Sequence, residues 1–305
     1  MKKITLAFGL LLSATFSFST PVVKQDPPAK NKLKVEVYQG RASSVNAYIF
    51  DNGQSIVLLD VLRSSLEAEK LAEHVKAKNL PVTHILISHG HPDHYMGINV
   101  MHQAFPNARI VVATPEIKAD VKGFSAWMES VGWLDKEQAL KPRSDANPAG
   151  FDYDNIVEVL PSNSLTLEGG GTLELETNYK PAECEHLTTV YSKDLNALFT
   201  SDLCYKGVHL WLGNGVDFDH IANWKDDLQQ LKQRYATLKP KVYPGHGEAG
   251  DLSLIDATDK YINDFVAVVK SAKTKEEAKA RMKALYANHK QADFLLQYSV
   301  DYHVK

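Results

Sequence analysis

Seven side chains of the metal-binding types follow short strand-like segments of this 305-residue chain. Residues 88–94 read Ser-His-Gly-His-Pro-Asp-His and place three imidazoles and one carboxylate in a single short run. The run follows residues 82–87, an apolar and β-branched stretch that predicts a buried strand. His186, Asp202 and His246 come later, each after or at the end of another strand-like segment. Because strand ends deliver ligand-binding residues to one edge of a sheet in α/β folds, these side chains are expected to converge.

The residue types indicate a catalytic metal centre. Zinc takes imidazole and carboxylate ligands, and a catalytic zinc site leaves one position for water. The five histidines and two aspartates of the set are enough for two such ions that share one carboxylate. Water bound to zinc has a pKa of about 7, so such a site supplies a nucleophile at neutral pH without a serine or a cysteine.

The ordered set resembles the signature of the metallo-β-lactamase-fold hydrolase superfamily: His89, His91, Asp93, His94, His186, Asp202 and His246. The resemblance extends from about Leu33 to about Gly250. It implies an α/β fold, namely a four-layer αββα sandwich with the metals at one edge of its two sheets. It also implies two ligand sets that share a bridging Asp202: His89, His91 and His186 for the first ion, and Asp93, His94 and His246 for the second.

Asp60 matches the aspartate that supports the first histidine cluster of this family from behind. The family usually has glycine after that aspartate and before the third histidine. Val61 and Glu185 stand at those two positions here, so the two loops are expected to differ in shape from those of the family.

Two residues are expected to act in catalysis beside the metals. By the same resemblance, Asp93 would hold the second metal and accept a hydrogen bond from the nucleophile. Tyr205, three positions after Asp202, resembles the lactonase branch of the family, in which a phenol hydrogen-bonds the substrate carbonyl or the leaving oxygen. The alternative for Tyr205 is a hydrophobic residue near a strand end.

Residues 1–20 predict a secretory signal peptide, because a basic start and an apolar stretch are followed by small residues before Pro21. The apolar stretch is too short for a membrane span, and no cysteine near the predicted cleavage point supports a lipid anchor. Residues 21–32 predict a flexible leader, and residues 33–305 predict one metallo-β-lactamase-fold domain. These features favour a periplasmic or secreted protein.

The charge of the chain argues against a nucleic-acid partner. Removing the signal peptide also removes Lys2 and Lys3, which changes the net charge from −3 to about −5. A weakly acidic chain without a basic stripe favours a small-molecule substrate over nucleic acid. The sequence does not define the oligomeric state.

The two cysteines, Cys184 and Cys204, flank the predicted ligands His186 and Asp202. Two strand-like segments on either side of a turn at residues 193–196 predict a hairpin. Folding it places residue 186 opposite about residue 202, and residue 184 opposite about residue 204. A disulfide and two free thiols are both compatible with this arrangement.

Strands and helices are predicted along the whole domain. The predicted strands are residues 33–37, 45–50, 55–59, 82–87, 109–113, 156–160, 164–167, 172–176, 186–191, 197–200 and 241–243. A helix capped by Ser64 or Ser65 carries Leu66, Leu71 and Val75 on one face. Further helices are predicted at 95–105, at 224–238 and over 252–305, with breaks near Thr274 and His289.

Residues 114–148 predict a helical segment that is rich in large apolar side chains: Phe124, Trp127, Met128, Val131, Trp133 and Leu134. One interpretation is a helical cap whose aromatic residues line a substrate pocket. The other is that these residues pack the helix on the sheet. The same alternatives apply to Trp211, which lies in a glycine-containing loop after Asp202.

Together these observations favour an exported dinuclear zinc hydrolase with two zinc ions per chain. A metal-bridging hydroxide would attack the acyl carbonyl of an ester, a lactone or a similar compound. A β-lactamase is an alternative, although that branch of the family has Cys or Ser where Asp202 stands. A mononuclear iron enzyme, or a metal-binding module without turnover, is the non-hydrolytic alternative.

Overall fold

The computed structural model describes residues 32–41, 44–289 and 292–305. These residues belong to one compact unit. The predicted signal peptide and leader lie outside the described residues, except for Lys32. Within the described ranges, no helix combines the length and the apolar character that a membrane crossing requires.

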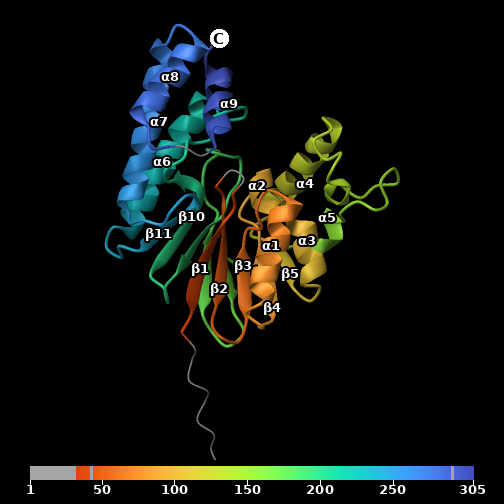
Figure 1. Ribbon diagram of the computed structural model, residues 1–305. Helices are drawn as coiled ribbons and strands as arrows, with labels where there is room; N and C mark the ends of the chain where they lie inside the picture. Colours follow the sequence, from red (N-terminus) through yellow and green to blue (C-terminus); the bar gives the residue numbers. More distant parts are fainter. Residues whose placement is uncertain (1–31, 42–43, 290–291) are drawn as a thin grey trace, which may run out of the picture. The chain divides into compact units, whose positions relative to one another are not determined.

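Two sheets form the centre of the unit (Figure 1). The six-stranded sheet has the order β1-β2-β3-β4-β5-β6, with β1 (Lys34–Gln39), β2 (Asn46–Asp51), β3 (Ile56–Leu59), β4 (Val82–Leu86), β5 (Arg109–Val112) and β6 (Val157–Val159). The five-stranded sheet has the order β11-β10-β9-β8-β7, with β7 (Ser164–Thr166), β8 (Thr172–Glu176), β9 (Thr189–Ser192), β10 (Ala197–Tyr205) and β11 (Lys241–His246).

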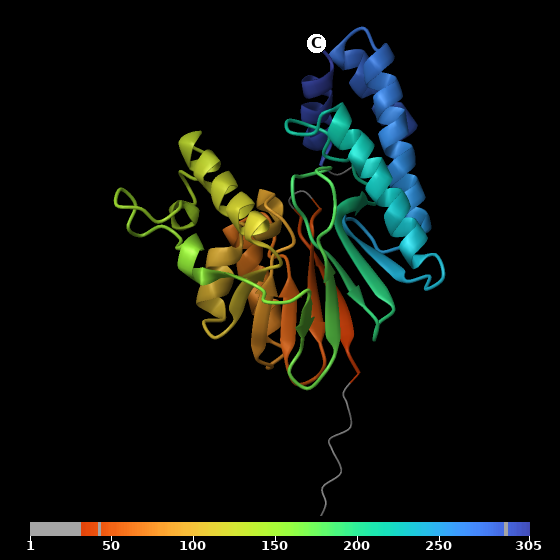
Figure 2. The same cartoon turned by 180° about the vertical axis from the view of Figure 1, so that it is seen from behind.

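Helices cover the outer face of each sheet, as the two opposite views show (Figures 1 and 2). The six-stranded sheet carries α1 (Ser65–Lys76), α2 (Pro92–Tyr95), α3 (Ile98–Ala104), α4 (Pro115–Ser130), the 3-10 turn η1 (Gln138–Leu140) and α5 (Tyr153–Ile156). The five-stranded sheet carries α6 (Phe218–Tyr235), α7 (Ser253–Ser271), α8 (Lys275–Leu285) and α9 (Asp293–His303). The predicted four-layer αββα sandwich and its helical C-terminal part are therefore confirmed.

Aromatic rings join the two sheets between the helical layers. The ring centroid of Phe199 on β10 lies 4.9 Å from that of Tyr48 and 4.8 Å from that of Phe50, both on β2. All three side chains are buried. Offset and edge-to-face contacts of this kind add to the apolar burial that holds the sandwich together.

Two helices differ in detail from their prediction. Ser64 caps α1 by accepting a hydrogen bond from the Glu67 N–H, but Leu66 is exposed and the buried face carries Ala68 and Ala72 beside Leu71 and Val75. The single helix predicted at residues 95–105 is instead α2 followed by α3, because the chain turns at Met96 and Gly97.

The predicted hairpin is present, but its register is displaced by one residue. Leu198 pairs with Tyr191 and Phe199 with Val190, and the pairing of β9 with β10 ends there. Ser201 has a left-handed φ of 48°, at an irregularity where β10 continues along β11. Cys184 and Cys204 are free thiols, so the disulfide alternative is not the one that the structure has.

Parallel strands end at a common edge of each sheet. In the six-stranded sheet β4 runs parallel to β3 and β5, and residues 88–94 follow its carboxyl end. In the other sheet β10 and β11 run parallel, and they carry Asp202 and His246 near their carboxyl ends. The topology therefore brings the two halves of the predicted metal site to one edge of the sandwich.

Candidate metal centre

Six of the seven predicted ligands lie in two adjoining buried groups. Each group contains one donor atom per residue, and all donor atoms within a group lie within 4.8 Å of one another. The first group is His89, His91, Glu183 and Asp202, and the second is Asp93, His94 and His246. Glu183 was not among the predicted ligands.

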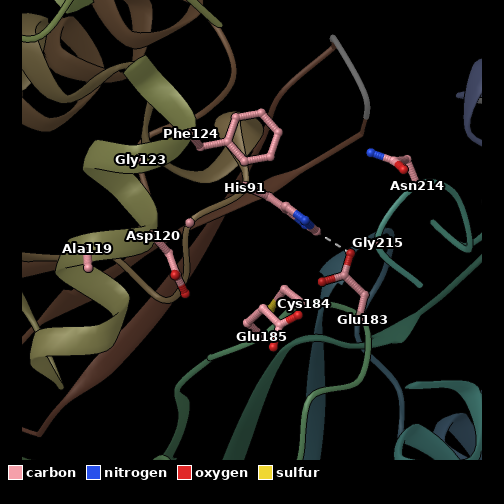
Figure 3. Close-up of a pocket in the computed structure, with 11 residues that line it drawn as sticks. His91, Ala119, Asp120, Gly123, Phe124, Glu183, Cys184, Glu185, Asn214 and Gly215 are labelled. Carbon is pink, nitrogen blue, oxygen red and sulfur yellow. Dashed lines mark ion pairs between the residues drawn. The ribbon is translucent and has the colours of Figure 1, made fainter. Parts of the chain in front are cut away.

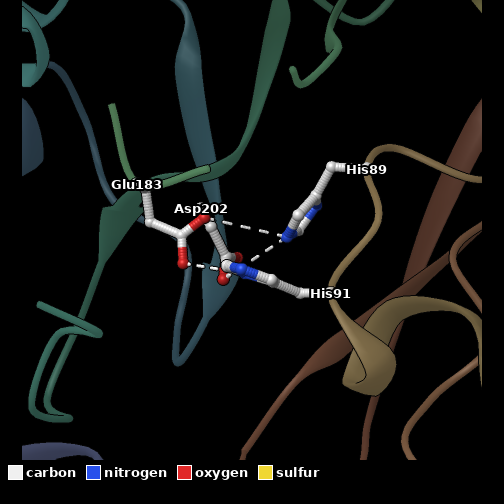
Figure 4. Close-up of side chains that lie close together, drawn as sticks. All are labelled: His89, His91, Glu183 and Asp202. Atoms are coloured by element: carbon white, nitrogen blue, oxygen red, sulfur yellow. Dashed lines mark ion pairs between the residues drawn. The ribbon is translucent and has the colours of Figure 1, made fainter. Parts of the chain in front are cut away.

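The first group combines two imidazoles with two carboxylates (Figure 4). His91 Nδ1 lies 3.0 Å from Glu183 Oε1, and His89 Nε2 lies 3.8 Å from Glu183 Oε2. His89 Nε2 also lies 4.0 Å from Asp202 Oδ2. Each side chain thus turns a ligand atom toward the same small volume.

Asp202 connects the two groups. Its Oδ1 lies 3.2 Å from His94 Nε2, and its Oδ2 lies 3.3 Å from His246 Nε2. Asp93 Oδ2 approaches the same His246 nitrogen at 3.5 Å. Because Asp202 Oδ2 also lies 4.0 Å from Nε2 of His89 in the first group, one carboxylate faces histidines of both groups, as a bridging ligand must.

Glycine makes the close approach of β11 to Asp202 possible. A Cβ atom at position 245 would collide with the Asp202 carboxylate and would lie 2.9 Å from the backbone carbonyl carbon of Ser201. The Pro-Gly-His sequence thereby lets His246 reach the carboxylate that the neighbouring strand carries.

The donor atoms are arranged to bind metal ions rather than to form hydrogen bonds with one another. Among the described residues, His89 Nε2, His94 Nε2, Glu183 Oε2 and Asp202 Oδ1 are buried without a hydrogen-bond partner. Buried polar atoms without partners are costly, and four of them facing one volume indicate a site that can bind a cation. Imidazole and carboxylate together are a suitable donor set for zinc.

Outer hydrogen bonds fix the orientation of the imidazoles. Asp60 Oδ2 lies 2.7 Å from His94 Nδ1, and the Ser88 backbone N–H donates to Asp60 Oδ1 at 2.8 Å. The hydroxyls of Ser88 and Ser201 lie 3.0 and 3.2 Å from His89 Nδ1. Contacts at Nδ1 leave Nε2 of both imidazoles directed at the centre, which is how outer residues orient metal ligands.

The buried charges shift the protonation of the cluster. Burial, and then His94, lower the pKa of His89 well below its ordinary value. Although burial opposes ionisation of Asp202, His94 and His246 hold its pKa well below its ordinary value. Burial raises the pKa of Glu183 against the opposing effect of His91. A neutral His89 and an ionised Asp202 are the protonation states in which both side chains can bind a metal.

The structure does not bring His186 to the two groups. Its imidazole is 44% exposed, and its Nδ1 lies 2.9 Å from Asp120 Oδ2 on α4. Gly90 lets α4 approach, because a Cβ at that position would lie 2.7 Å from the Cβ of Asp120. His186 therefore connects α4 to the loop that carries Glu183, whose carboxylate lies beside His89 and His91.

Tyr205 lies inside the centre rather than at its surface. Its hydroxyl lies 2.6 Å from Asp202 Oδ2 and 3.1 Å from Glu183 Oε1. Its ring stacks on the imidazole of His246, with 4.8 Å between centroids. Burial, and then the neighbouring Asp202, raise the pKa of Tyr205 well above its ordinary value, so the phenol stays protonated and can donate to a carboxylate.

Two cavities adjoin the centre. The larger, of about 700 Å³, is lined by Arg63, His91, Pro92, Asp93, Phe124, Trp127, Trp133, Glu183, Asp202, Tyr205, Trp211, Asn214, His246, Phe294, Leu295 and Tyr298. The smaller, of about 320 Å³, lies between α4 and the loop of Glu183 and Cys184 (Figure 3). His91 contributes to both. The larger cavity has the size and the mostly apolar wall of a small-molecule site.

Both interpretations of residues 114–148 apply, each to different side chains. Met128 and Leu134 are buried, as packing on the sheet requires. Phe124, Trp127 and Trp133 line the larger cavity, as a substrate-facing cap requires.

Comparisons with known proteins agree with this geometry. The sequence profile of the Metallo-beta-lactamase superfamily matches residues 40–246. The chain is 25% identical over 222 residues to a Metallo-beta-lactamase type 2 of Bacillus cereus, covering 72% of this chain and 73% of the relative. A relative of the same name from Bacillus sp. (strain 170) is 25% identical over 224 residues, covering 72% of each chain.

Solved structures show the same fold at low sequence identity. A metallo-beta-lactamase from Pontibacter korlensis superposes with a TM-score of 0.55 and 21% identity, covering 78% of this chain and 98% of that one. The metallo-beta-lactamase FIM-1 from Pseudomonas aeruginosa, in its mono-zinc form, superposes with a TM-score of 0.51 and 16% identity, covering 76% of this chain and 91% of that one.

Proposed function

The chain belongs to the metallo-β-lactamase superfamily of metal-dependent hydrolases, and from that premise we propose that it is an exported dinuclear zinc hydrolase of acyl compounds. The observation that carries the proposal is the position of Asp202. Its oxygens lie 3.2 Å from His94 and 3.3 Å from His246, both of the second group. The same carboxylate lies 4.0 Å from His89 of the first group. A shared carboxylate of this kind supports two ions rather than one.

We assign the first ion to His89, His91 and Glu183, and the second to Asp93, His94 and His246. Asp202 is the ligand that both ions share. This assignment replaces His186 by Glu183 and makes both sites mixtures of imidazole and carboxylate.

When bound, the two ions would supply Lewis acidity for the acyl oxygen and a water of lowered pKa as nucleophile. Asp93 lines the larger cavity, where it can accept a hydrogen bond from the nucleophile and hold it in one orientation. The hydroxyl of Tyr205 already contacts Asp202 and Glu183, which favours a positioning role for Tyr205 over direct contact with the substrate.

Hydrolysis of β-lactams is the second candidate function. The two curated relatives, both named metallo-beta-lactamase, favour it. The carboxylate at position 202 speaks for the broader acyl assignment, because the β-lactamase branch has a Cys or Ser there.

Metal analysis and a substrate panel test the proposal. The purified chain is expected to contain about two zinc ions by mass spectrometry, whereas one iron ion would favour the mononuclear iron alternative. Turnover of lactones and esters, measured beside a chromogenic cephalosporin, separates the two hydrolase candidates. Cleavage of phosphodiesters without cleavage of any acyl compound would overturn the acyl assignment.

Export is tested separately. Residues 1–20, which support it by their sequence, lie outside the described residues. We expect the full chain, expressed in a bacterium with two membranes, to be recovered from the periplasm or the medium without residues 1–20. Retention of an uncleaved chain in the cytoplasm would contradict this part of the proposal.

A further inference from the structure

An arc of aromatic rings runs from α4 across the metal centre to α9. Centroid distances between successive rings are 5.0 Å for Trp133–Trp127, 5.2 Å for Trp127–Phe124, 6.0 Å for Phe124–His91, 6.4 Å for His91–Trp211, 6.2 Å for Trp211–Tyr298 and 6.5 Å for Tyr298–Phe294. The proposed metal ligand His91 stands in the middle of the arc. All seven rings line the larger cavity, together with Asp93, Asp202 and His246.

Several of these rings are more exposed than core packing allows. Trp127 is 45% exposed, Trp133 55% and Tyr298 53%. Contiguous exposed aromatic surface is uncommon on a folded domain and marks a binding surface, here one that is continuous with the proposed metal centre.

Trp211 and Phe294 are held in place by their neighbours. A Cβ atom at Gly213 would lie 2.8 Å from the Trp211 indole, so the glycine lets the ring fold back over the loop. The guanidinium of Arg63 lies over the Phe294 ring, 5.3 Å from its centroid, as in a cation–π contact. Fixed rings lose little entropy when a ligand binds, which favours recognition of a matching flat group.

Part of the arc comes from outside the segment that the family profile matches. That segment ends at residue 246, whereas Phe294 and Tyr298 belong to α9 (Asp293–His303). The C-terminal helices therefore add a wall to the cavity that membership of the superfamily does not explain.

We propose that this aromatic arc binds a bulky aromatic substituent of the substrate, so that the substrate class is aryl-substituted acyl compounds rather than short-chain ones. The inference rests on the acyl hydrolase function proposed above. The substituent would lie between Trp211 and the rings of α9, while the carbonyl lies beside Asp202 and His246. A cavity of about 700 Å³ has room for both parts of such a molecule.

The test compares two δ-lactones that carry either a phenylethyl or a methyl group at the same ring carbon. We expect kcat/KM of the zinc-loaded full chain to be about tenfold higher for the phenylethyl lactone, because burial of a phenyl ring contributes that much or more. In Tyr298→Ala and Phe294→Ala the ratio of the two kcat/KM values should fall toward one, chiefly through KM for the phenylethyl lactone. Tyr302→Ala is the matched control, since Tyr302 is a 44% exposed tyrosine of α9 outside the cavity lining, and it should keep the ratio.

A binding measurement separates this inference from the proposed function. By calorimetry, 3-phenylpropanoate should bind the zinc-loaded chain about tenfold more tightly than propanoate, and the two cavity variants should lose that difference. Aromatic preference in binding without turnover of any lactone, ester or cephalosporin would support the arc while refuting acyl hydrolysis. Equal kcat/KM for the two lactones, together with equal binding of the two acids, would overturn the arc proposal and leave hydrolysis standing. Unfolding temperature and zinc content show that each variant is folded and loaded.

Discussion

The metal centre and the aromatic arc share one cavity, yet they are built in opposite ways. The centre is buried and charged, and His89 and His94 are fully inaccessible to solvent. The arc is partly exposed and apolar, and its outer rings contact one another rather than the core. The first region has no room for variation, because even a Cβ at Gly245 would collide with Asp202. Apart from His91, which belongs to both regions, the arc can change side chains without moving a metal ligand.

This difference suggests a division of labour. Residues at the strand ends determine which reaction is possible, because their geometry is fixed by both sheets. Residues on α4, on the loop of Trp211 and on α9 determine which molecule enters, because they surround the reaction centre without contributing ligands. The type of reaction thus depends on the metal centre, and the substrate specificity depends on the aromatic arc.

The largest effect is expected from removal of the shared carboxylate. Asp202→Ala should lower kcat/KM by about tenfold or more and weaken the binding of at least one metal ion, because the carboxylate faces His89 of the first group and both His94 and His246 of the second. Metal content by mass spectrometry and the activity of the same preparation test this. Full activity with two retained zinc ions would show that Asp202 is not the bridge. Asp256→Ala, which removes an exposed carboxylate from α7, is the control.

The second prediction sets Glu183 against His186. Glu183→Ala should weaken one metal site about tenfold or more, because the side chain is buried against His91 at 3.0 Å. His186→Ala should retain both metals, because that imidazole is 44% exposed and pairs with Asp120. Metal titration of both variants is the measurement. Metal loss in the His186 variant alone would restore the ligand set that the resemblance implies.

The sequence predicted most of the centre because most of it is local. Residues 88–94 present their ligands from one loop, and the strand before it is recognisable from its apolar run. Glu183 and His186 are three positions apart in one polar loop, and their roles depend on the route of that loop. The one-residue displacement of the hairpin and the left-handed Ser201 follow from tertiary packing, which sequence periodicity does not report.

The arc was harder to predict for the same reason. Aromatic residues at helical spacing indicate an apolar face, but the sequence does not tell whether that face meets the sheet or a cavity. Met128 and Trp127 are neighbours, and one is buried while the other is 45% exposed. The contribution of Phe294 to the cavity depends on how α9 packs, far along the chain from residues 88–94.

A third prediction concerns Arg63, which lines the larger cavity. Its guanidinium lies over the Phe294 ring, where it can bind an anionic group of the substrate. Arg63→Met should lower kcat/KM about fivefold for a lactone with a carboxylate substituent, and less for the methyl ester of the same compound. Kinetics on the two compounds test this, with Arg109→Met as control because Arg109 is paired with Glu158 at the protein surface. Equal losses on both compounds would assign Arg63 to packing on Phe294 instead.

The smallest effect is expected where the loop of Glu183 is anchored, away from both regions. Asp227 on α6 is buried and accepts a hydrogen bond from the backbone N–H of Lys180 at 3.1 Å. Burial raises the pKa of Asp227 to about 6. A raised pKa means that the folded chain holds this proton more tightly than the unfolded chain. The resulting stabilisation is complete below the unfolded pKa of about 4 and is lost as the pH rises through about 6.

In Asp227→Asn the side-chain amide cannot ionise, and its oxygen can still accept the hydrogen bond from the backbone N–H of Lys180. We therefore expect the variant to unfold about 2 °C above the parent chain at pH 8, with a smaller gain at pH 5. Thermal unfolding of zinc-loaded samples at both pH values tests this, and Asp145→Asn is the control because Asp145 is exposed and lies far along the chain from Asp227. If the variant unfolded at the same temperature as the parent chain at pH 8, or at a lower one, neighbouring groups would be stabilising the ionised Asp227 carboxylate in the folded state. The anchor of the Glu183 loop would then be electrostatic, and losing it should also weaken the first metal site.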